Sequence, residues 1–446
     1  MLDNLQQMLR EQCKLDKDKL ILVGVSGGPD SLCLFSLLHQ AGWQVIAAHF
    51  NHQLRPEAAE EAAAVESLAQ SLDVPFVGGA GDVKQYAAQN KLSTEAAARE
   101  LRYRFLFEQA RRYSAQAVAV GHTADDQVET VLMHFIRGAG LNGLKGMAYC
   151  SLLEGFDREI PLIRPLLDVW RAETVAYCDE HGLEPHYDAS NESTDFLRNR
   201  LRHELIPLLE SYNPRFREAA WRAGKTLSSD YELLSSTLEP LWRTALLRQS
   251  DAFIELDPSY LSTQASTAQI HIIQRAAQRL LPDCEVSFET LQRGGSLLSD
   301  GSQERVDLVG GLFLLREGER LYMATDEADL PRDQWPQMPA GKDAIRFTVP
   351  FEAALGSGWK FSASLCDAQA APASWGDAYR FEAWLDASAL PNRLFLRIRR
   401  DGDRFQPLGM DGDSQKLSDF FVNVKLPARA RDRWPLVCAA DTVLWV

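Results

Sequence analysis

The sequence predicts a multidomain protein that begins with an α/β fold built on a parallel, doubly wound sheet. From about residue 20 to residue 140, short apolar runs alternate with longer stretches of helical period. A turn rich in glycine and proline directly follows the first of these runs. The chain has 446 residues, more than one hydrophobic core usually organises, so further domains are expected after the sheet.

The strands and helices of the first part follow from its apolar pattern. We expect strands at "LILVGV" (20–25), "QVIAAHF" (44–50), "VPFV" (74–77) and "AVAVGH" (117–122), and helices near 30–41, 56–71, 93–112 and 124–137. This order predicts a parallel sheet with helices on both faces, whose ligands bind beyond the carboxyl ends of the strands. Asp168 is expected to cap a further helix that Gly182 ends.

Two domains are predicted after the sheet. We place the α/β domain at 1–210 and a mainly helical domain at 211–328, with a hairpin at "LVGGLFLLREGERLYM". The stretch "ADLPRDQWPQMPAGKD" reads as a linker. Together with a small α+β domain made largely of alternating strands, it fills 329–446.

Composition excludes several classes of protein. The 47 Lys and Arg residues against 62 Asp and Glu residues give a net charge of −15, which argues against indiscriminate coating of nucleic acid. No apolar stretch reaches the roughly eighteen residues that a membrane span needs, and the N-terminus does not resemble an export signal, so we expect a cytoplasmic protein without a membrane partner. The seven cysteines include no Cys-x-x-Cys pair, which disfavours disulfides, zinc and iron–sulfur sites.

The turn "SGGPDS" after the first strand has the features of a phosphate-binding loop. Glycines let the backbone approach an anion, and the N-terminus of the following helix offers free N–H groups and a positive dipole end. Asp30 would repel a phosphate unless a cation lay between them, so we expect it to hold Mg²⁺. The alternative is an ordinary glycine-rich turn with a capping aspartate. The expected ATP-binding residues of this turn are Ser26, Gly27, Gly28, Pro29, Asp30 and Ser31.

This string resembles the pyrophosphate loop of the N-type ATP pyrophosphatases. The resemblance implies a Rossmann-like PP-loop ATPase fold and cleavage of ATP to AMP and pyrophosphate as an acceptor oxygen is adenylated. The family includes metabolite synthetases, tRNA thiolases and lysidine synthetases, and the loop alone does not choose among them.

Three later motifs also lie near expected strand ends or helix starts. "HFNHQLR" contains His49, Asn51, His52 and Arg55, and "ARELRYRF" contains Arg102 on a helix whose arginines would otherwise form a solvated face. "GHTADDQVET" places His122 at a strand end and crowds acids into the first turns of the next helix. Helix capping by Asp125 is the alternative for one of these acids, but Asp126 and Glu129 share a face three residues apart.

Together these motifs resemble the lysidine synthetase family. The "GHxxDDQxET" run is followed by "RGxGxxGLxGM", and "IRPLLDVWRAE" and "DASNESTDFLRNRLRHE" also fit, the latter with Asp188 and Asn191. The resemblance implies a reaction on the wobble cytidine of the CAU-anticodon isoleucine tRNA, in which ATP activates the base and L-lysine displaces AMP.

The resemblance also assigns roles to individual residues. The expected catalytic residues are Asp30, Arg102, His122 and Glu129, with His49 and Asn51 as further ATP-binding residues and Asp126 and Glu129 as lysine-binding residues. Arg102 would stabilise the leaving pyrophosphate, and a carboxylate at Glu129 would bind or deprotonate the lysine amine.

Two basic stretches in this acidic chain are candidates for tRNA contact. Residues 198–225 hold seven Lys and Arg against three acids, and residues 393–433 hold ten against six, a local excess of +4 in each. Ordinary variation of surface charge is the alternative. The expected tRNA-binding residues are Arg198, Arg202, Arg215, Arg399 and Arg404. A homodimer is left open.

Three rival functions remain at this point. A tRNA thiolase on the same ATP domain needs a persulfide-carrying cysteine or an iron–sulfur site, and no cysteine here lies in a comparable motif. A synthetase for a small metabolite would have no use for two further domains. A non-enzymatic tRNA-binding protein would not need the loop or the clustered acids.

Overall fold

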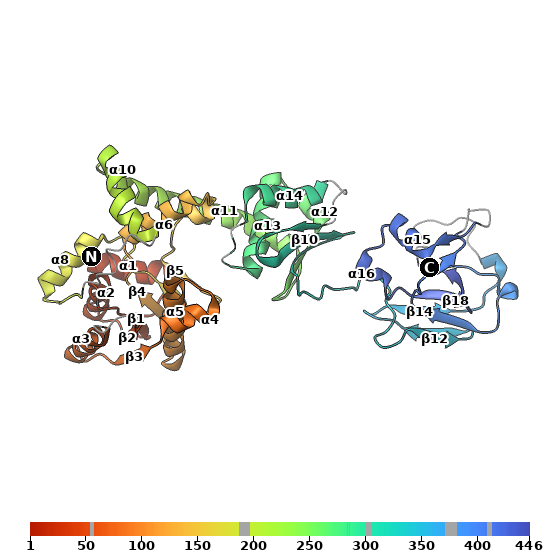
Figure 1. Ribbon diagram of the computed structural model, residues 1–446, viewed down its shortest axis with the longest axis horizontal. Helices are drawn as coiled ribbons and strands as arrows, with labels where there is room; N and C mark the ends of the chain where they lie inside the picture. Colours follow the sequence, from red (N-terminus) through yellow and green to blue (C-terminus); the bar gives the residue numbers. More distant parts are fainter. Residues whose placement is uncertain are drawn as a thin grey trace. The chain divides into compact units, whose positions relative to one another are not determined.

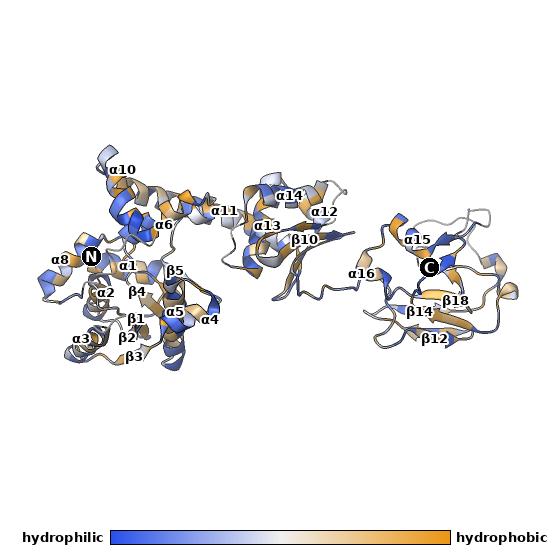
Figure 2. Ribbon diagram, in the orientation of Figure 1, coloured by the Kyte–Doolittle hydropathy of each residue, from blue (hydrophilic) through white to orange (hydrophobic). Residues whose placement is uncertain are grey.

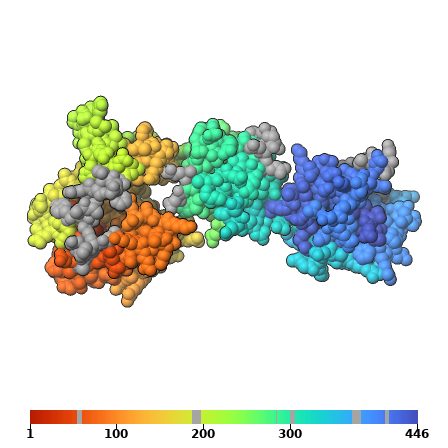
Figure 3. Space-filling model, viewed as in Figure 1, coloured from red at the N-terminus to blue at the C-terminus, as the bar shows by residue number. Residues whose placement is uncertain are grey.

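The computed structural model describes residues 1–53, 58–186, 197–282, 284, 286–299, 305–370, 381–407 and 413–446. Figure 3 draws the remaining residues in grey. The chain divides into two compact units, Met1–Trp242 and Arg243–Val446. Among the described residues, no helix combines the length and the apolar character needed to cross a membrane.

The first unit is built on a six-stranded sheet with the order β3-β2-β1-β4-β6-β5, in which all neighbours are parallel except β5 and β6. The central strands are buried on both faces, as their continuous apolar runs require. This confirms the expected parallel sheet. The strands are β1 (Ile21–Gly24), β2 (Val45–Asn51), β3 (Phe76–Ala80), β4 (Ala117–Val120), β5 (Cys150–Ser151) and β6 (Leu162–Ile163).

Helices cover both faces of this sheet (Figure 1). Leu5 of α1, Val65 of α3 and Tyr177 of α8 join one apolar cluster, and Phe107 of α5 belongs to the cluster on the other face. The helices are α1 (Leu2–Glu11), α2 (Pro29–Gln40), α3 (Ala58–Ser71), α4 (Val83–Asn90), α5 (Thr94–Arg112), α6 (Ala124–Ile136), α7 (Leu141–Leu144), α8 (Arg171–His181), α9 (Leu197–Arg200), the π-helix η2 (Leu201–Leu205), α10 (Ile206–Tyr212) and α11 (Phe216–Ala245).

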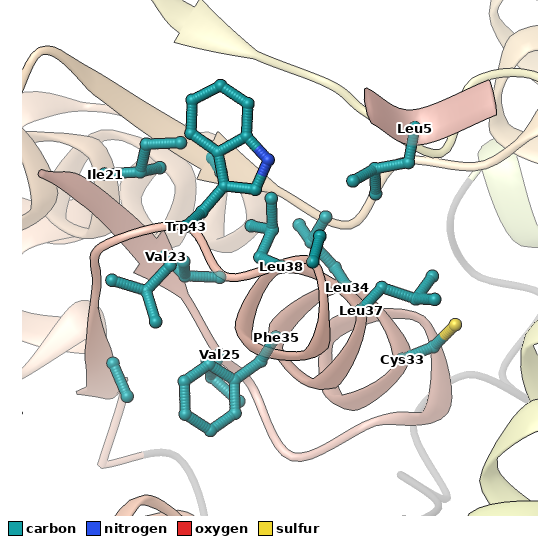
Figure 4. Packing of buried hydrophobic residues seen from close by; sticks show 14 of the residues in the cluster. Leu5, Ile21, Val23, Val25, Cys33, Leu34, Phe35, Leu37, Leu38 and Trp43 are labelled. Carbon is teal, nitrogen blue, oxygen red and sulfur yellow. The ribbon is translucent and has the colours of Figure 1, made fainter. Parts of the chain in front are cut away.

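The first apolar cluster fixes α2 against β1. Figure 4 shows Leu34, Phe35 and Leu38 of α2 in one cluster with Val23 of β1 and Val25, which directly follows β1. All five side chains are almost fully buried. Since burial of each such side chain contributes about 1.5–3 kcal/mol, this contact holds the turn between β1 and α2 in a defined place.

One expected helix start is wrong. Asp168 does not cap α8, which begins at Arg171 with the Trp170 N–H donating to Glu173 Oε2 at 2.8 Å. Asp168 instead accepts hydrogen bonds from Tyr149 Oη at 2.7 Å and from Lys225 Nζ at 3.1 Å. The expected end at Gly182 is confirmed, since this glycine adopts a left-handed conformation with φ 65°.

The second unit starts with a five-stranded antiparallel sheet of order β7-β8-β11-β10-β9 that packs with three helices. The expected hairpin is confirmed as β10 and β11. Strands β7, β8 and β9 were not predicted from the sequence. The elements are β7 (Leu246–Gln249), β8 (Phe253–Leu256), α12 (Pro258–Ser262), α13 (Ser266–Leu280), α14 (Phe288–Ser299), β9 (Arg305–Asp307), β10 (Leu312–Glu317) and β11 (Arg320–Thr325).

The rest of the second unit is α+β. A four-stranded antiparallel sheet of order β12-β15-β18-β19 carries two short helices and two small hairpins. Figure 2 colours β18 as hydrophobic, in agreement with its burial. The elements are β12 (Ala344–Phe347), β13 (Phe351–Ala354), β14 (Lys360–Ala363), β15 (Leu394–Arg397), β16 (Arg404–Phe405), β17 (Gln415–Lys416), α15 (Leu417–Asn423), α16 (Ala428–Arg431), β18 (Leu436–Ala439) and β19 (Thr442–Trp445).

Close backbone packing joins β4 to the turn after β1. A Cβ atom at Gly121 would lie 2.9 Å from the carbonyl carbon and oxygen of Asp30 and 3.0 Å from the amide nitrogen of Ser31. Real Cβ atoms essentially never come this close to backbone. Glycine at position 121 therefore lets the end of β4 lie directly against the predicted phosphate loop.

We predict that Gly121→Ala destabilises the protein by about 1–3 kcal/mol, because the added methyl group must push the loop backbone away. Gly155→Ala is the matched control, since no atom lies within 4 Å of its added methyl. Chemical unfolding of both variants measures the effect. Equal stabilities of Gly121→Ala and the wild type would contradict the close packing.

Candidate functional site

The turn between β1 and α2 has the backbone geometry expected of an anion site. Gly27 adopts φ +91°, which favours glycine, and α2 starts at Pro29 with Gly28 as its N-cap. The Ser31 hydroxyl oxygen accepts from the Ser26 N–H at 3.1 Å and donates to the Gly28 carbonyl at 2.9 Å. The side chain of Ser31 thus stabilises the conformation of the loop at the N-terminus of the buried helix α2.

Asp30 is tied to α8. One of its carboxylate oxygens accepts from Arg171 Nη2 at 2.9 Å and from Nε at 3.2 Å, and the other accepts from the Thr174 hydroxyl. Burial raises the pKa of Asp30 above its usual range, against the lowering by Arg171 and Thr174. Both partners of Asp30 were missed from the sequence.

Asp125 and Asp126 anchor the start of α6 in different ways. Asp126 Oδ2 accepts from the Thr123 N–H at 2.8 Å, which completes a capping box. Asp125 accepts from Arg217 Nη1 at 2.6 Å and from the Arg171 N–H at 2.8 Å. The expected cap at Asp125 is therefore wrong: Asp126 caps α6, and Asp125 binds the segment after the sheet.

Glu129 is the most enclosed carboxylate of this group, with 1% of its surface exposed. Arg198 Nε donates to it at 2.7 Å, and Arg202 donates through Nε at 2.7 Å and through Nη2 at 3.1 Å. Two of the five arginines predicted to contact tRNA thus lie in one cluster with an acid predicted to bind lysine.

The same cluster sets the charge of Asp126. Burial alone would raise the pKa of its carboxyl group, but Arg198, the Thr123 N–H and Arg171 together lower that pKa below its usual range. Arg198 Nη2 donates to Asp126 at 3.0 Å. Asp126 is consequently ionised at neutral pH and is a hydrogen-bond acceptor.

His122 lies close enough to Asp126 for the two side chains to interact electrostatically, and Arg102 acts on His122 in the same way. Burial, assisted by Arg164 and Arg102, lowers the pKa of His122 to about 3, although Asp126 opposes the shift. The imidazole is therefore neutral at physiological pH and cannot serve as a fixed positive charge. Within the part of the chain that the structure describes, His122 Nδ1 and Arg102 Nε are buried without a hydrogen-bond partner.

The remaining predicted nucleotide contacts lie at the end of β2. His49 is buried, and its Nδ1 lies 2.9 Å from the Val25 carbonyl oxygen, so the ring braces the strand that leads into the loop. Asn51 Oδ1 accepts from the Gln53 N–H at 2.8 Å. Arg55, Asp188 and Asn191 lie outside the described residues.

The other predicted tRNA contacts have different surroundings. Arg215 is exposed in the turn directly before α11. In the second unit, Arg399 pairs with Asp432 at 2.7 Å, and Arg404 Nε donates to the Ser414 hydroxyl at 3.0 Å. Of the five, Arg198 and Arg202 are thus the ones already bound to carboxylates within the sheet domain.

Four side chains that interact with the candidate residues were not singled out from the sequence: Arg164, Arg171, Thr174 and Arg217. Three of them lie in or next to "IRPLLDVWRAE", which was recognised as a motif without roles for its residues. The match to this motif could have made its two arginines candidates for the site. Nothing local in the sequence says which carboxylate each of them meets.

No three His, Cys, Asp or Glu side chains group as ligands of a metal ion among the described residues. A Mg²⁺ ion bound with nucleotide usually takes one or two carboxylates and completes its shell with phosphate oxygens and water. Asp30 beside the loop fits that pattern. Its ion pair with Arg171 would have to open for the carboxylate to face a metal.

Comparison with known proteins finds similarity over the whole chain. A family model described as "PP-loop domain" matches residues 1–209, and one described as "TilS substrate C-terminal domain" matches residues 394–446. The chain is 32% identical over 459 residues to the tRNA(Ile)-lysidine synthase of Dehalococcoides mccartyi (strain CBDB1), covering 100% of this chain and 94% of the relative.

Two further similarities complete the comparison. The tRNA(Ile)-lysidine synthase of Symbiobacterium thermophilum is 34% identical over 466 residues, covering 100% of this chain and 93% of that protein. The solved structure of the U34-tRNA thiolase NcsA from Methanococcus maripaludis is 18% identical with a TM-score of 0.43, covering 51% of this chain and 78% of that chain. The synthase likeness thus spans the whole chain.

We predict that the stability of the protein carries a pH dependence from His122. The unfolded histidine binds a proton below about pH 6.5, whereas the folded one stays neutral down to about pH 3. Unfolding is therefore favoured as the pH falls, by about 1.4 kcal/mol per pH unit from this group.

Chemical unfolding of the wild type and of His122→Gln between pH 7 and pH 4.5 tests this. Relative to the variant, the wild type should lose stability progressively below about pH 6.5. A stability difference that stays constant with pH would contradict a buried neutral imidazole.

Proposed function

This chain belongs to the tRNA(Ile)-lysidine synthase family of ligases, and from that premise we propose that the loop 26–31 and the acids of α6 form one active site. The observation that carries this proposal is the contact of Gly121 with the backbone of Asp30 and Ser31. It supports the proposal because His122 and α6 directly follow Gly121 in the chain. The reaction attaches L-lysine to carbon 2 of the wobble cytidine of the CAU-anticodon tRNA(Ile) and changes its codon reading from AUG to AUA.

In the first step, ATP activates the base. The oxygen on carbon 2 of the cytidine attacks the α-phosphorus, the bond to the bridging oxygen breaks, and pyrophosphate leaves with the electron pair. The loop from Ser26 to Ser31 binds the phosphates through backbone N–H groups and the dipole of α2. Mg²⁺ held by Asp30 would neutralise phosphate charge when bound. Arg102 stabilises the leaving pyrophosphate, and His49 and Asn51 flank the nucleotide.

In the second step, lysine displaces AMP. The ε-amine attacks carbon 2, and the bond from carbon 2 to the adenylate oxygen breaks. The amine arrives protonated and must lose a proton before it attacks. Asp126 and Glu129 attract the ammonium group, and one of them accepts the proton.

The arginines of α9 and η2 give this step a specific requirement. Glu129 and Asp126 already bind Arg198 and Arg202, so the lysine ammonium must compete with two guanidinium groups for the same oxygens. Displaced guanidinium groups would then be available to the phosphates of the tRNA or of the adenylate. In this proposal, the same arginines bind the carboxylates first and a phosphate group after the lysine has displaced them.

Recognition of the tRNA belongs to surfaces beyond the loop. We assign Arg215 and, in the C-terminal α+β domain, Arg399 and Arg404 to phosphate contacts, because single-stranded anticodon loops are bound largely through charge and stacking. A cytoplasmic location follows from the tRNA substrate. A homodimer remains an expectation.

The sulfur-transfer alternative has one feature in its favour. A hydrogen bond with Cys13 lowers the pKa of Cys150 to about 7 despite burial, and Arg164 contributes, which would make Cys150 the more reactive thiol. Cys150 nevertheless packs against the apolar cluster that contains Cys13, and a thiolase needs a persulfide carrier or an iron–sulfur site. The full-length synthase relatives favour lysine as the nucleophile.

The direct test is incorporation of radiolabelled L-lysine into CAU-anticodon tRNA(Ile) with ATP and Mg²⁺. We expect one lysine per tRNA, with release of AMP and pyrophosphate. The methionine tRNA with the same anticodon serves as the control and should stay unlabelled. Sulfur incorporation, or tRNA binding without ATP cleavage, would favour one of the rival functions.

We predict that Glu129→Gln lowers lysine incorporation by a factor of about 10²–10⁴, the usual contribution of a general base, because the amide cannot accept the proton. Pyrophosphate release in the absence of lysine should fall much less. Glu108→Gln, at an exposed position of α5, is the control and should behave as the wild type. Normal lysine transfer by Glu129→Gln would remove Glu129 from this role.

A further inference from the structure

Three guanidinium groups gather around one buried tyrosine. Tyr103 of α5 has 0% of its surface exposed. The Cζ atom of Arg99 lies 4.8 Å from the centroid of its ring, and the Cζ atom of Arg102 lies 5.2 Å from it. Arg164, directly after β6, is near enough to act electrostatically on the same side chain. The ring thus lies among three cationic groups.

Arg164 is the most enclosed of the three arginines, with 5% of its surface exposed. Its Nη1 donates to the Ala148 carbonyl and to the Ser151 hydroxyl, each at 2.9 Å. These partners are neutral. Burial lowers the pKa of Arg164, as expected for a charge held away from water.

Several polar atoms of this group lack partners. Among the residues that the structure describes, Arg102 Nε, Tyr103 Oη, His122 Nδ1 and Arg164 Nε are buried without a hydrogen-bond partner. A buried polar atom without a partner costs free energy, and a charged one costs more. Arg102 Nε and Arg164 Nε can only donate and belong to charged groups, so these two atoms favour a missing binding partner with acceptor oxygens and negative charge.

The position of Arg164 connects this group to the loop. β6 pairs with β4 in parallel, with Ile163 opposite Ala119, so Arg164 follows the strand at the same sheet edge as Gly121 and His122. Gly121 in turn lies against Asp30 and Ser31. The cationic group therefore lies along the edge where nucleotides bind in such sheets.

We propose that Arg164, together with Arg99 and Arg102, forms an oxyanion site for the phosphoryl oxygens of the nucleotide and of the pyrophosphate that leaves it. This proposal rests on the function proposed above and adds Arg164 and Arg99 to it. The near-complete burial of Arg164 favours a small anion delivered through the loop over an RNA backbone. Its planar guanidinium suits two phosphoryl oxygens better than an ammonium group would.

Binding of inorganic pyrophosphate to the full chain tests the site, by calorimetry and by the rise of the melting temperature. Arg164→Met keeps the length of the side chain and removes its charge, and we expect a loss of pyrophosphate affinity of tenfold or more. Arg164→Lys should restore part of it. Arg99→Met, which removes an exposed guanidinium, should weaken binding less. Arg112→Met, at the far end of the same helix, is the matched control and should bind as the wild type.

The arms of the experiment separate the possible outcomes. Unchanged pyrophosphate affinity in Arg164→Met and Arg99→Met would overturn the proposal. Loss of tRNA affinity with intact pyrophosphate binding would also overturn it and assign the group to an RNA phosphate. If Arg164→Met fails to fold, Arg164→Lys and Arg99→Met still decide between these results. Lysine incorporation by the wild type is scored separately, so the proposed function and this site can fail independently.

Discussion

The structure of the first unit depends on neutralising carboxylates buried at the carboxyl edge of its sheet. Asp30, Asp126 and Glu129 are each largely removed from water, and an unpaired buried charge would be too costly to keep. Arg171, Arg198 and Arg202 supply the opposite charge. Each of these ion pairs binds the segment that follows the sheet, so charge balance at the edge also fixes α8, α9 and η2 in place.

The contacts that hold the first unit together also form the candidate site. The loop needs β4 close by, and Gly121 permits that contact. The buried acids of α6 need cations, which Arg198 and Arg202 provide. In the proposed reaction, the ammonium group of lysine competes with these arginines. His122 remains neutral between the two regions because burial removes its proton. One edge of a sheet can therefore bind phosphates on one side and an amine on the other.

Much of the fold and part of the site could be predicted from the sequence, because strands, glycine turns and acids at helix starts are local features. The arginine partners could not, since Arg198 lies 69 residues from Glu129 and Arg171 lies 141 residues from Asp30. Asp168 was misassigned because a capping rule is local, while its partners Tyr149 and Lys225 are tertiary. Strands β7 and β8 were missed because their short apolar runs interrupt a region of helical period.

The central claim is that one edge of the sheet first adenylates the tRNA and then transfers lysine. Its most direct test is to measure pyrophosphate and AMP separately, with tRNA(Ile) and ATP present, before and after lysine is added. We expect tRNA-dependent pyrophosphate release without lysine, and AMP release only once lysine arrives. Pyrophosphate release that requires lysine but not tRNA would mean that lysine itself is adenylated, which would contradict the account.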